Sequence, residues 1–337
     1  MENEQKIDFL AIGDVFNDTF IELEDAHVTC NIDNANCTIS MKFGDKLPYK
    51  SASVVRGVGN AGNAATAAAR LGLSSALLSI TGNDDDGQKI FDHFEKEHVS
   101  QMFMKKDDNL PTNNAYVLKY GPERTILVKQ EAYPYTVPVE LLNTNKPKWI
   151  YLTSIGKSTI QFHHDLMQWL AQNPEVKLAF QPGTFQMILG KDELADVYKR
   201  SDAFFCNKEE AQRILDLPTA DFPELHIAMR ALGPKMIIIT DGVNGLTASD
   251  EDEKVVFLPM YPDPKSPVSR TGAGDATSST IVAALSLGIP FAEAVIWGPV
   301  NSMNVVQHVG AQEGLLSREK LQEYLAVAPE EYKLKDL

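Results

Sequence analysis

Cysteine is scarce in this chain of 337 residues, which contains only Cys30, Cys37 and Cys206. An odd and sparse set without regular spacing argues against a disulfide framework. Six residues separate Cys30 from Cys37, and this spacing matches no common zinc-binding pattern. We therefore expect all three cysteines to be reduced and to pack as small apolar side chains.

Long apolar runs are also missing from the sequence. No stretch of about 18 consecutive apolar residues occurs, and a membrane-spanning helix needs one of that length. The first residues, Met1 to Lys6, are polar and lead directly into a short apolar segment, which does not resemble a secretion signal. We therefore expect a cytoplasmic protein.

Positive charge is outnumbered, with 31 Lys and Arg against 46 Asp and Glu and a formal net charge of −15. An acidic surface repels the phosphates of nucleic acids and of anionic membranes, so we expect neither as a partner. A nucleotide substrate is still compatible with this charge, because backbone N–H groups and a metal can bind its phosphates locally.

The chain does contain enough apolar residues, 44% of the total, to bury a large core. The run 7–12 predicts a buried strand that ends at Gly13-Asp14, and beyond Lys148 strand-like and helix-like segments alternate. The expected strands there are 149–153, 176–180, 203–206 and 236–240, and the expected helices are 164–171, 192–198, 209–215 and 224–232. This alternation predicts a doubly wound, mostly parallel sheet flanked by helices.

Two other stretches, 20–55 and 115–128, contain short alternating runs separated by Asp, Asn and Gly. Such runs are typical of antiparallel strands. We expect them to form a small antiparallel β lid, made of residues 15–50 and 111–131. The main α/β domain would then contain residues 1–14, 51–110 and 132–337.

The stretch that carries the chemistry is 271–275, Thr-Gly-Ala-Gly-Asp, followed by a helix-like segment at 277–287. Small residues let a backbone loop approach a ligand, and the free N–H groups of the following helix make that loop a cradle for anions. Asp275 beside such a cradle could accept a proton from an attacking hydroxyl. Taken alone, Asp275 could equally be a helix cap.

Five further stretches have the order found in one kinase family. They are 59–64 (Gly-Asn-Ala-Gly-Asn-Ala), 81–87 (Thr-Gly-Asn-Asp-Asp-Asp-Gly), 207–210 (Asn-Lys-Glu-Glu), 240–245 (Thr-Asp-Gly-Val-Asn-Gly) and 309–311 (Val-Gly-Ala). Together with 271–275 they resemble the motifs of the ribokinase-like (PfkB-type) kinases, which phosphorylate carbohydrates and nucleosides. Motif-like residues span 13–314, so the resemblance covers nearly the whole chain.

The resemblance implies ATP as co-substrate and Mg²⁺ as cofactor. It also implies catalytic roles for Asp275 as the base and for Gly272, Ala273 and Gly274 as an anion hole. Residues implied on the nucleotide side are Asn207, Thr240, Gly242, Gly245, Asn301 and Asn304. Residues implied on the substrate side are Asp14, Gly59, Asn60, Asn63, Asp18 and Arg124. Glu210, and Asn207 through water, would hold the metal.

Several of these residues also have a simpler interpretation. Asn207 and Glu210 could be a helix N-cap and a first-turn acid, and Arg124 could be a solvated cation on a strand. Asn301 and Asn304 could be ordinary polar residues of a helix.

Two positions depart from the family pattern. Val58 stands where many relatives have a glycine, and valine disfavours positive φ, so we expect a locally different substrate loop. Ser269 stands where an aspartate often helps to bind a monovalent cation, and Arg270 follows it. Both changes argue against activation by potassium.

The sequence therefore predicts a kinase that phosphorylates a hydroxyl of a sugar or sugar-like substrate. A nucleoside kinase of the same fold is the alternative, and a non-catalytic ligand sensor is a third interpretation. Because the exposed edge of a small sheet is often covered by a partner subunit, we also expect a homodimer that forms through the β lid.

Overall fold

The computed structural model describes residues 6–30, 37–121 and 123–337. Within these residues, nine strands form one sheet in the order β17-β16-β15-β14-β13-β12-β11-β1-β6. From β14 across the sheet to β6, neighbouring strands pair parallel. From β14 to the other edge at β17, neighbouring strands pair antiparallel. This confirms the predicted doubly wound, mostly parallel sheet.

The strands of this sheet are short and largely buried. They are β1 (Ile7–Ile12), β6 (Ser75–Leu78), β11 (Pro147–Leu152), β12 (Lys177–Phe180), β13 (Ala203–Asn207), β14 (Met236–Thr240), β15 (Leu246–Ser249), β16 (Val256–Leu258) and β17 (Lys335–Asp336). Apolar residues on both faces explain the nearly continuous hydrophobic runs in the sequence, because helices cover both sides of a parallel sheet.

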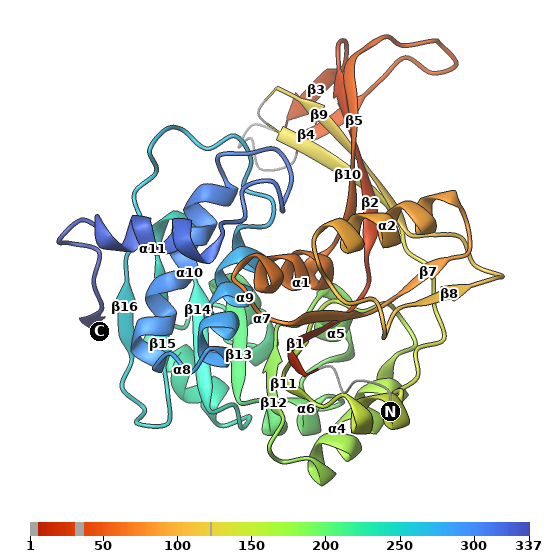
Figure 1. Cartoon of the computed structure of the whole chain (residues 1–337). Helices are drawn as coiled ribbons and strands as arrows, with labels where there is room; N and C mark the ends of the chain where they lie inside the picture. The colour runs from red at the N-terminus through yellow and green to blue at the C-terminus, as the bar shows by residue number, and fades with distance from the viewer. Residues whose placement is uncertain (1–5, 31–36, 122) are drawn as a thin grey trace.

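Helices cover the two faces of the sheet as separate layers (Figure 1). One layer contains α1 (Asn60–Arg70), α2 (Asp85–Lys96), α9 (Ala273–Ser286), α10 (Phe291–Val305) and α11 (Arg318–Ala326). The other contains α3 (Val139–Thr144), α4 (Ile160–Gln172), α6 (Ala195–Arg200), α7 (Lys208–Leu215) and α8 (Phe222–Arg230). The short helices α5 (Thr184–Leu189) and η1 (Gly242–Asn244) follow β12 and β14.

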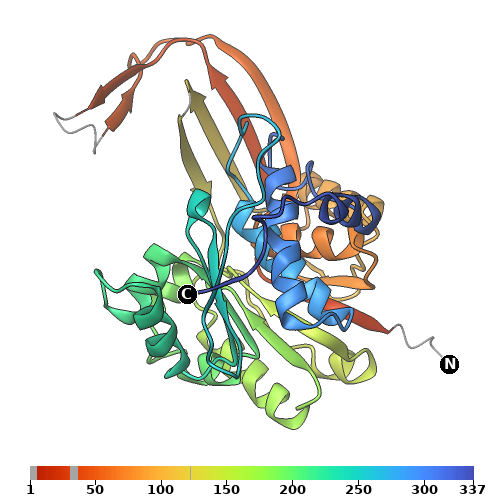
Figure 2. The same cartoon turned by 90° about the vertical axis from the view of Figure 1, so that its left-hand side faces the viewer.

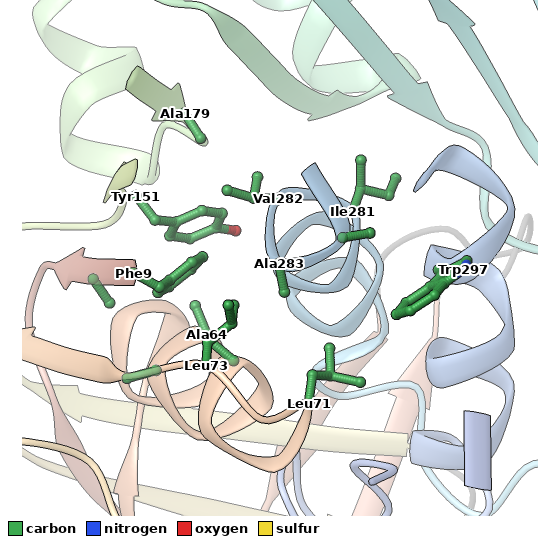
Figure 3. Close-up of a cluster of buried hydrophobic side chains, with 14 of the residues drawn as sticks. Phe9, Ala64, Leu71, Leu73, Tyr151, Ala179, Ile281, Val282, Ala283 and Trp297 are labelled. Atoms are coloured by element: carbon green, nitrogen blue, oxygen red, sulfur yellow. The ribbon is translucent and has the colours of Figure 1, made fainter. Parts of the chain in front are cut away.

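The first layer places α1 beside α9, and both helices pack on the sheet (Figure 3). Small residues make this close approach possible, since Ala61, Ala64, Ala65 and Ala68 of α1 are fully buried there. The ring of Tyr151 lies between the sheet and α9 in the same cluster. Two helices that begin at the candidate site are thereby fixed against each other.

A second, four-stranded sheet projects from the main body (Figures 1 and 2). Its strands are β10 (Glu123–Lys129), β9 (Asn114–Tyr120), β2 (Phe16–Leu23) and β5 (Tyr49–Val58). Two small ribbons accompany it, β3 (His27–Cys30) with β4 (Cys37–Ser40) and β7 (Ile80–Gly82) with β8 (Lys105–Asp107). The predicted antiparallel strands are present, although β2 pairs parallel with β9.

Two sequence-based expectations differ from the structure here. The boundary expected at residue 51 lies inside β5, because residues 51–58 continue the strand and pair with β2. The structure also joins Cys30 to Cys37 by a disulfide across the β3–β4 ribbon, so the prediction of three reduced cysteines is wrong for this pair. Pairing in register on adjacent strands brings the two cysteines together. Cys206 is free and buried, as expected.

Every helix that the structure describes is too short or too polar to cross a lipid bilayer.

Candidate active site

The candidate site lies where the carboxyl ends of parallel strands meet the beginnings of α1 and α9. Asp14 follows β1, Asn207 ends β13 and Thr240 ends β14. Ligands of open α/β sheets bind at this edge.

Asp275 lies in the first turn of α9. This helix begins about one turn before the start that was expected from the sequence. Its carboxylate accepts hydrogen bonds from Asn63 Nδ2 (2.8 Å) and Gln181 Nε2 (3.2 Å). No side-chain cap bond is present at the start of α9 among the described residues, so the interpretation of Asp275 as a mere helix cap is not supported. Burial, with a smaller contribution from the charge of Glu210, raises the pKa of Asp275 to about 6, and the two hydrogen bonds oppose this rise.

A chain of side chains orients Asn63, which the sequence analysis had assigned to substrate contact. Gln312 Nε2 donates to Gly57 O (2.8 Å) and to Asn63 Oδ1 (3.1 Å). His93 Nε2 bonds to Gln312 Oε1 (2.7 Å). Because a carbonyl can only accept, Gly57 fixes the orientation of Gln312, which in turn directs Asn63 Nδ2 towards Asp275. Asn63 is therefore a positioning residue in this structure.

Gln181 is held in a similar way on the other side of Asp275. Its Oε1 accepts hydrogen bonds from Ser278 Oγ (2.8 Å) and from the hydroxyl of Tyr151. Its Nε2 is thereby left to point at Asp275. The sequence analysis missed Gln312, His93, Tyr151 and Ser278 altogether. The proximity of Gln312 to the motif at 309–311 was the only signal available.

The glycine loop before Asp275 needs its small residues for space and for conformation. Gly272 has φ 83°, and a Cβ atom there would lie 2.3 Å from Ala311 Cβ. Ala273 and Gly274 begin α9 and line a cavity of about 450 Å³. The N–H group of Ala273 donates to Arg270 O (3.4 Å), and the N–H groups of the next two residues of α9 have no such partner among the described residues and favour an anion.

The remaining wall of this cavity contains Thr240 and Gly242, together with Tyr261, Met303 and Val306. Gly245 lies outside the lining, and its role is steric, because a Cβ atom would lie 2.4 Å from Leu258 O. A volume of about 450 Å³ is within the range of small-molecule sites.

Asn301 and Asn304, expected in the adenine wall, do not line the cavity. Asn301 is fully buried and bonds to Thr280 Oγ1 (2.8 Å) and Leu316 N (2.9 Å). Asn304 Nδ2 donates to Gly314 O (2.7 Å). Both amides stabilise the α9–α10 region and the segment that follows, and the neighbouring residues of α10 face the cavity in their place.

Asn207 and Glu210 form a reciprocal capping box at the start of α7, with bonds of 2.8 and 2.9 Å. The structural interpretation of this pair is therefore correct. Burial raises the pKa of Glu210, and its charge acts on Asp275. Two carboxylates close enough to repel each other suit a divalent cation, which would neutralise them. Among the described residues, no group of three or more His, Cys, Asp or Glu side chains could hold a metal by itself.

On the substrate side, the structure distinguishes the two aspartates. The Asp14 carboxylate is buried and accepts hydrogen bonds from Tyr135 OH (2.6 Å) and Gln130 Nε2 (2.5 Å). Asp18 has no such bond among the described residues, and burial raises its pKa to about 6. Each carboxylate oxygen can accept more than one hydrogen bond, so Asp14 keeps room for a ligand as well, and both aspartates stay candidates for substrate contact.

Gly59 and Asn60 lie at the start of α1, beside this carboxylate pair. Gly59 has φ 103°, and a Cβ atom there would lie 2.7 Å from Asp14 O. Asn60 is the first residue of α1 and is half-buried. Positive φ occurs at Gly57 and Gly59, on either side of Val58, so the valine itself stays extended. Arg124 is exposed and borders a separate cleft.

Comparisons with known proteins agree with this geometry. Residues 30–318 match the model of the pfkB family carbohydrate kinases. Ribokinase from Bacillus subtilis is 25% identical over 287 residues, which are 85% of this chain and 92% of that protein. An ATP-dependent 6-phosphofructokinase from Thermoanaerobacterium thermosaccharolyticum is 23% identical, covering 81% and 85%.

Solved structures show the same fold. The ribokinase of Arabidopsis thaliana, complexed with ribose and ATP, superposes with a TM-score of 0.78 at 19% identity. That alignment covers 95% of this chain and 99% of the other. Ribokinase from Giardia lamblia gives 0.78 at 18% identity, covering 96% and 99%. The family match spans most of the sequence, and the chain therefore belongs to the pfkB family of carbohydrate kinases.

Proposed function

We propose that this kinase transfers the γ-phosphoryl group of ATP to a hydroxyl of a sugar or sugar-like acceptor, with Asp275 as general base. The observation that carries this proposal is the orientation of Asp275. Two amide donors hold its carboxylate beside the anion-binding start of α9. A pKa of about 6 keeps most of the carboxylate ionised at pH 7 while leaving it basic enough to take a proton.

In the proposed reaction, the acceptor O–H bond breaks as Asp275 takes the proton and the oxygen forms a bond to the γ-phosphorus. ADP leaves as the bond to its β-phosphate oxygen breaks. The N–H group of Gly274 stabilises the charge on the transferred group, and that of Ala273 can join it by giving up its bond to Arg270 O. Asp14, Asp18 and the residues around Gly59 orient the acceptor. The 450 Å³ cavity holds the nucleotide, with Thr240 and Gly242 along its wall.

Mg²⁺, when bound, would neutralise charge on the phosphates. Glu210, and Asn207 through water, are the residues that would hold it, and their capping box leaves Glu210 Oε1 for this purpose. Removing divalent metal with EDTA should abolish turnover, and adding excess Mg²⁺ should restore it. Turnover that persists in EDTA would contradict a metal-dependent reaction.

We do not propose activation of the kinase by potassium. Ser269 Oγ accepts a hydrogen bond from Thr271 N (3.2 Å), and Arg270 borders the nucleotide cavity. A cation at this side of the loop would meet the positive charge of Arg270. We also infer a cytoplasmic location, as the sequence analysis expected, where ATP is available.

The acceptor class is tested by measuring ADP release over a panel of sugars and nucleosides. Stimulation by sugars supports the proposal, whereas stimulation by nucleosides alone supports the alternative, a nucleoside kinase. If no alcohol stimulates ADP release, the protein is a ligand sensor. Binding of a nucleoside would also need an aromatic side chain on which its base could stack.

We further propose that the protein is a homodimer that forms through the four-stranded sheet. Val54, Tyr116 and Leu127 lie in one cross-strand row, with Thr19 between Val54 and Tyr116. Their exposed fractions are 48%, 48% and 54%. A row of exposed apolar side chains on a projecting sheet is typical of a protein interface.

A further inference from the structure

A second cleft, of about 280 Å³, lies between the four-stranded sheet and the loop that precedes α9. Lys119 of β9, Arg124 of β10 and Arg270 of the loop all line it. The rest of the lining is Phe20, Pro267, Val268, Ser269 and Val309. Among the described residues the lining thus contains three cations and no carboxylate. In a protein with a net charge of −15, this is a local reversal of sign.

The two lid cations face each other directly. Lys119 and Arg124 are partners in the β9–β10 register, and like charges in directly opposite positions destabilise a sheet. Glu22 is next to Lys119 in register, but its carboxylate is turned to Lys50 (3.6 Å) and Ser51 (3.3 Å) of β5. Among the described residues, no side chain of β2 forms an ion pair with Lys119 or Arg124.

None of the three cations forms an ion pair within the described part of the chain. Lys129, five residues after Arg124 on the same strand, does pair, with Glu131 at 3.1 Å. A cation on β10 can therefore form an ion pair where a carboxylate is near. On β9 and β10, the described cations without an ion pair are Lys119 and Arg124, and both line the cleft.

The position of the cleft relates it to the acceptor. Phe20 lines the cleft and shares a face of β2 with Asp18, because residues two apart on a strand point to the same side. Pro267 and Arg270 line both this cleft and the 450 Å³ cavity. The cleft therefore adjoins the 450 Å³ cavity at these two residues, and its volume suits one end of a ligand better than a whole one.

We propose that this cleft binds an anionic group, a phosphate or carboxylate, that the acceptor carries at a carbon other than the one phosphorylated. This inference rests on the proposed kinase function and narrows the acceptor to a sugar phosphate or sugar acid. Arginine offers a planar fork of donors that matches phosphate and carboxylate oxygens, and lysine adds a point charge. Binding the anion also relieves the repulsion between Lys119 and Arg124.

Calorimetric titration without ATP measures binding apart from turnover. The probes are matched pairs: ribose and ribose 5-phosphate, fructose and fructose 6-phosphate, glucose and gluconate. At least one charged member should bind tenfold or more tighter than its neutral partner. The double variant Lys119→Gln/Arg124→Gln should lose that preference, while the control Lys129→Gln keeps it. If the double variant does not fold, the two single variants replace it. Each should lower the affinity for the charged member threefold or more.

Equal or tighter binding of every neutral member would overturn the proposal. Turnover of a neutral acceptor in that case would leave the kinase function intact. Conversely, charge-dependent binding without any turnover would support the anion site and count against the kinase reaction. A variant that raises the KM for ATP and leaves the charge preference unchanged would show that the cations serve the nucleotide, which also overturns the proposal.

Discussion

Asp18 and Asp275 share one physical property, a pKa raised to about 6 by burial. They differ in their partners, since Asp275 accepts two amide hydrogen bonds. Buried carboxylates of this kind are costly to the folded state once they ionise. Their retention is explained if one binds the acceptor and the other takes its proton.

Asp18→Asn should stabilise the unliganded protein at neutral pH. The pKa of Asp18 is higher in the folded state than its ordinary value of 3.8, so folding favours the protonated form, and this contribution is lost as pH rises through about 6. The melting temperature of the variant should therefore equal that of the wild type near pH 4 and exceed it above pH 6. Each gain of ~1 kcal/mol in the free energy of unfolding should raise the melting temperature by roughly 2 °C. A constant difference across pH would refute the assignment. The KM for the acceptor should rise at the same time.

Gln312→Leu should weaken catalysis through the position of Asn63. The hydrogen bond from Asn63 lowers the pKa of Asp275, so loss of its orientation should move the acidic limb of the kcat–pH profile upward from about 6. We expect kcat at pH 7 to fall about tenfold with little change in the KM for ATP. Gln88→Leu, on the exposed side of α2, is the matched control. An acidic limb that does not move would show that Gln312 has only a structural role.

Only part of this chemistry could be predicted from the sequence. Asp275 stands in a local motif, so its neighbours along the chain identify it. The residues that position it cannot be identified in this way, because Asn63 lies 212 residues before Asp275 and 249 residues before Gln312. Asn301 illustrates the opposite error. The family resemblance placed it on the nucleotide side, but its side chain forms a buried hydrogen bond within the protein.

At the scale of elements, the four-stranded sheet depends on pairings that local patterns do not specify. The alternation in 115–119 and 124–128 correctly predicted β9 and β10. The extent of β5 was missed because its first residues are exposed and mixed in character, and its pairing with β2 is long-range. The disulfide between Cys30 and Cys37 was not predicted because the register of β3 and β4 places the two cysteines opposite each other, and their spacing in the sequence does not specify that register.

Leu127→Glu tests the role of this sheet in assembly. The side chain lies in the exposed apolar row with Tyr116, and a charge there would be buried without a partner in a dimer. Sedimentation analysis should show a dimer for the wild type and a monomer for the variant. Lys129→Glu, at the end of the same strand, controls for a change of charge. A monomeric wild type would contradict the proposed interface.

At the scale of the whole molecule, the parallel sheet brings distant motifs to one edge. The order of strands and helices was predictable because buried parallel strands have continuous apolar runs. That order fixes which segments follow the strand ends, and so which residues gather there. The orientation of the four-stranded sheet over this edge was not predictable, because it brings together segments far apart in the sequence, such as Phe20 and the loop at 267–270, which line one cleft.

The proposed role of Asp275 is to remove the proton from the acceptor hydroxyl. It is tested by Asp275→Asn, measured as kcat with a saturating acceptor and as MgATP affinity by calorimetry. Loss of a general base should lower kcat by about 10³-fold, while the affinity for MgATP stays within about twofold and the melting curve remains cooperative. Turnover within tenfold of the wild type, with the same affinity for MgATP, would contradict the claim.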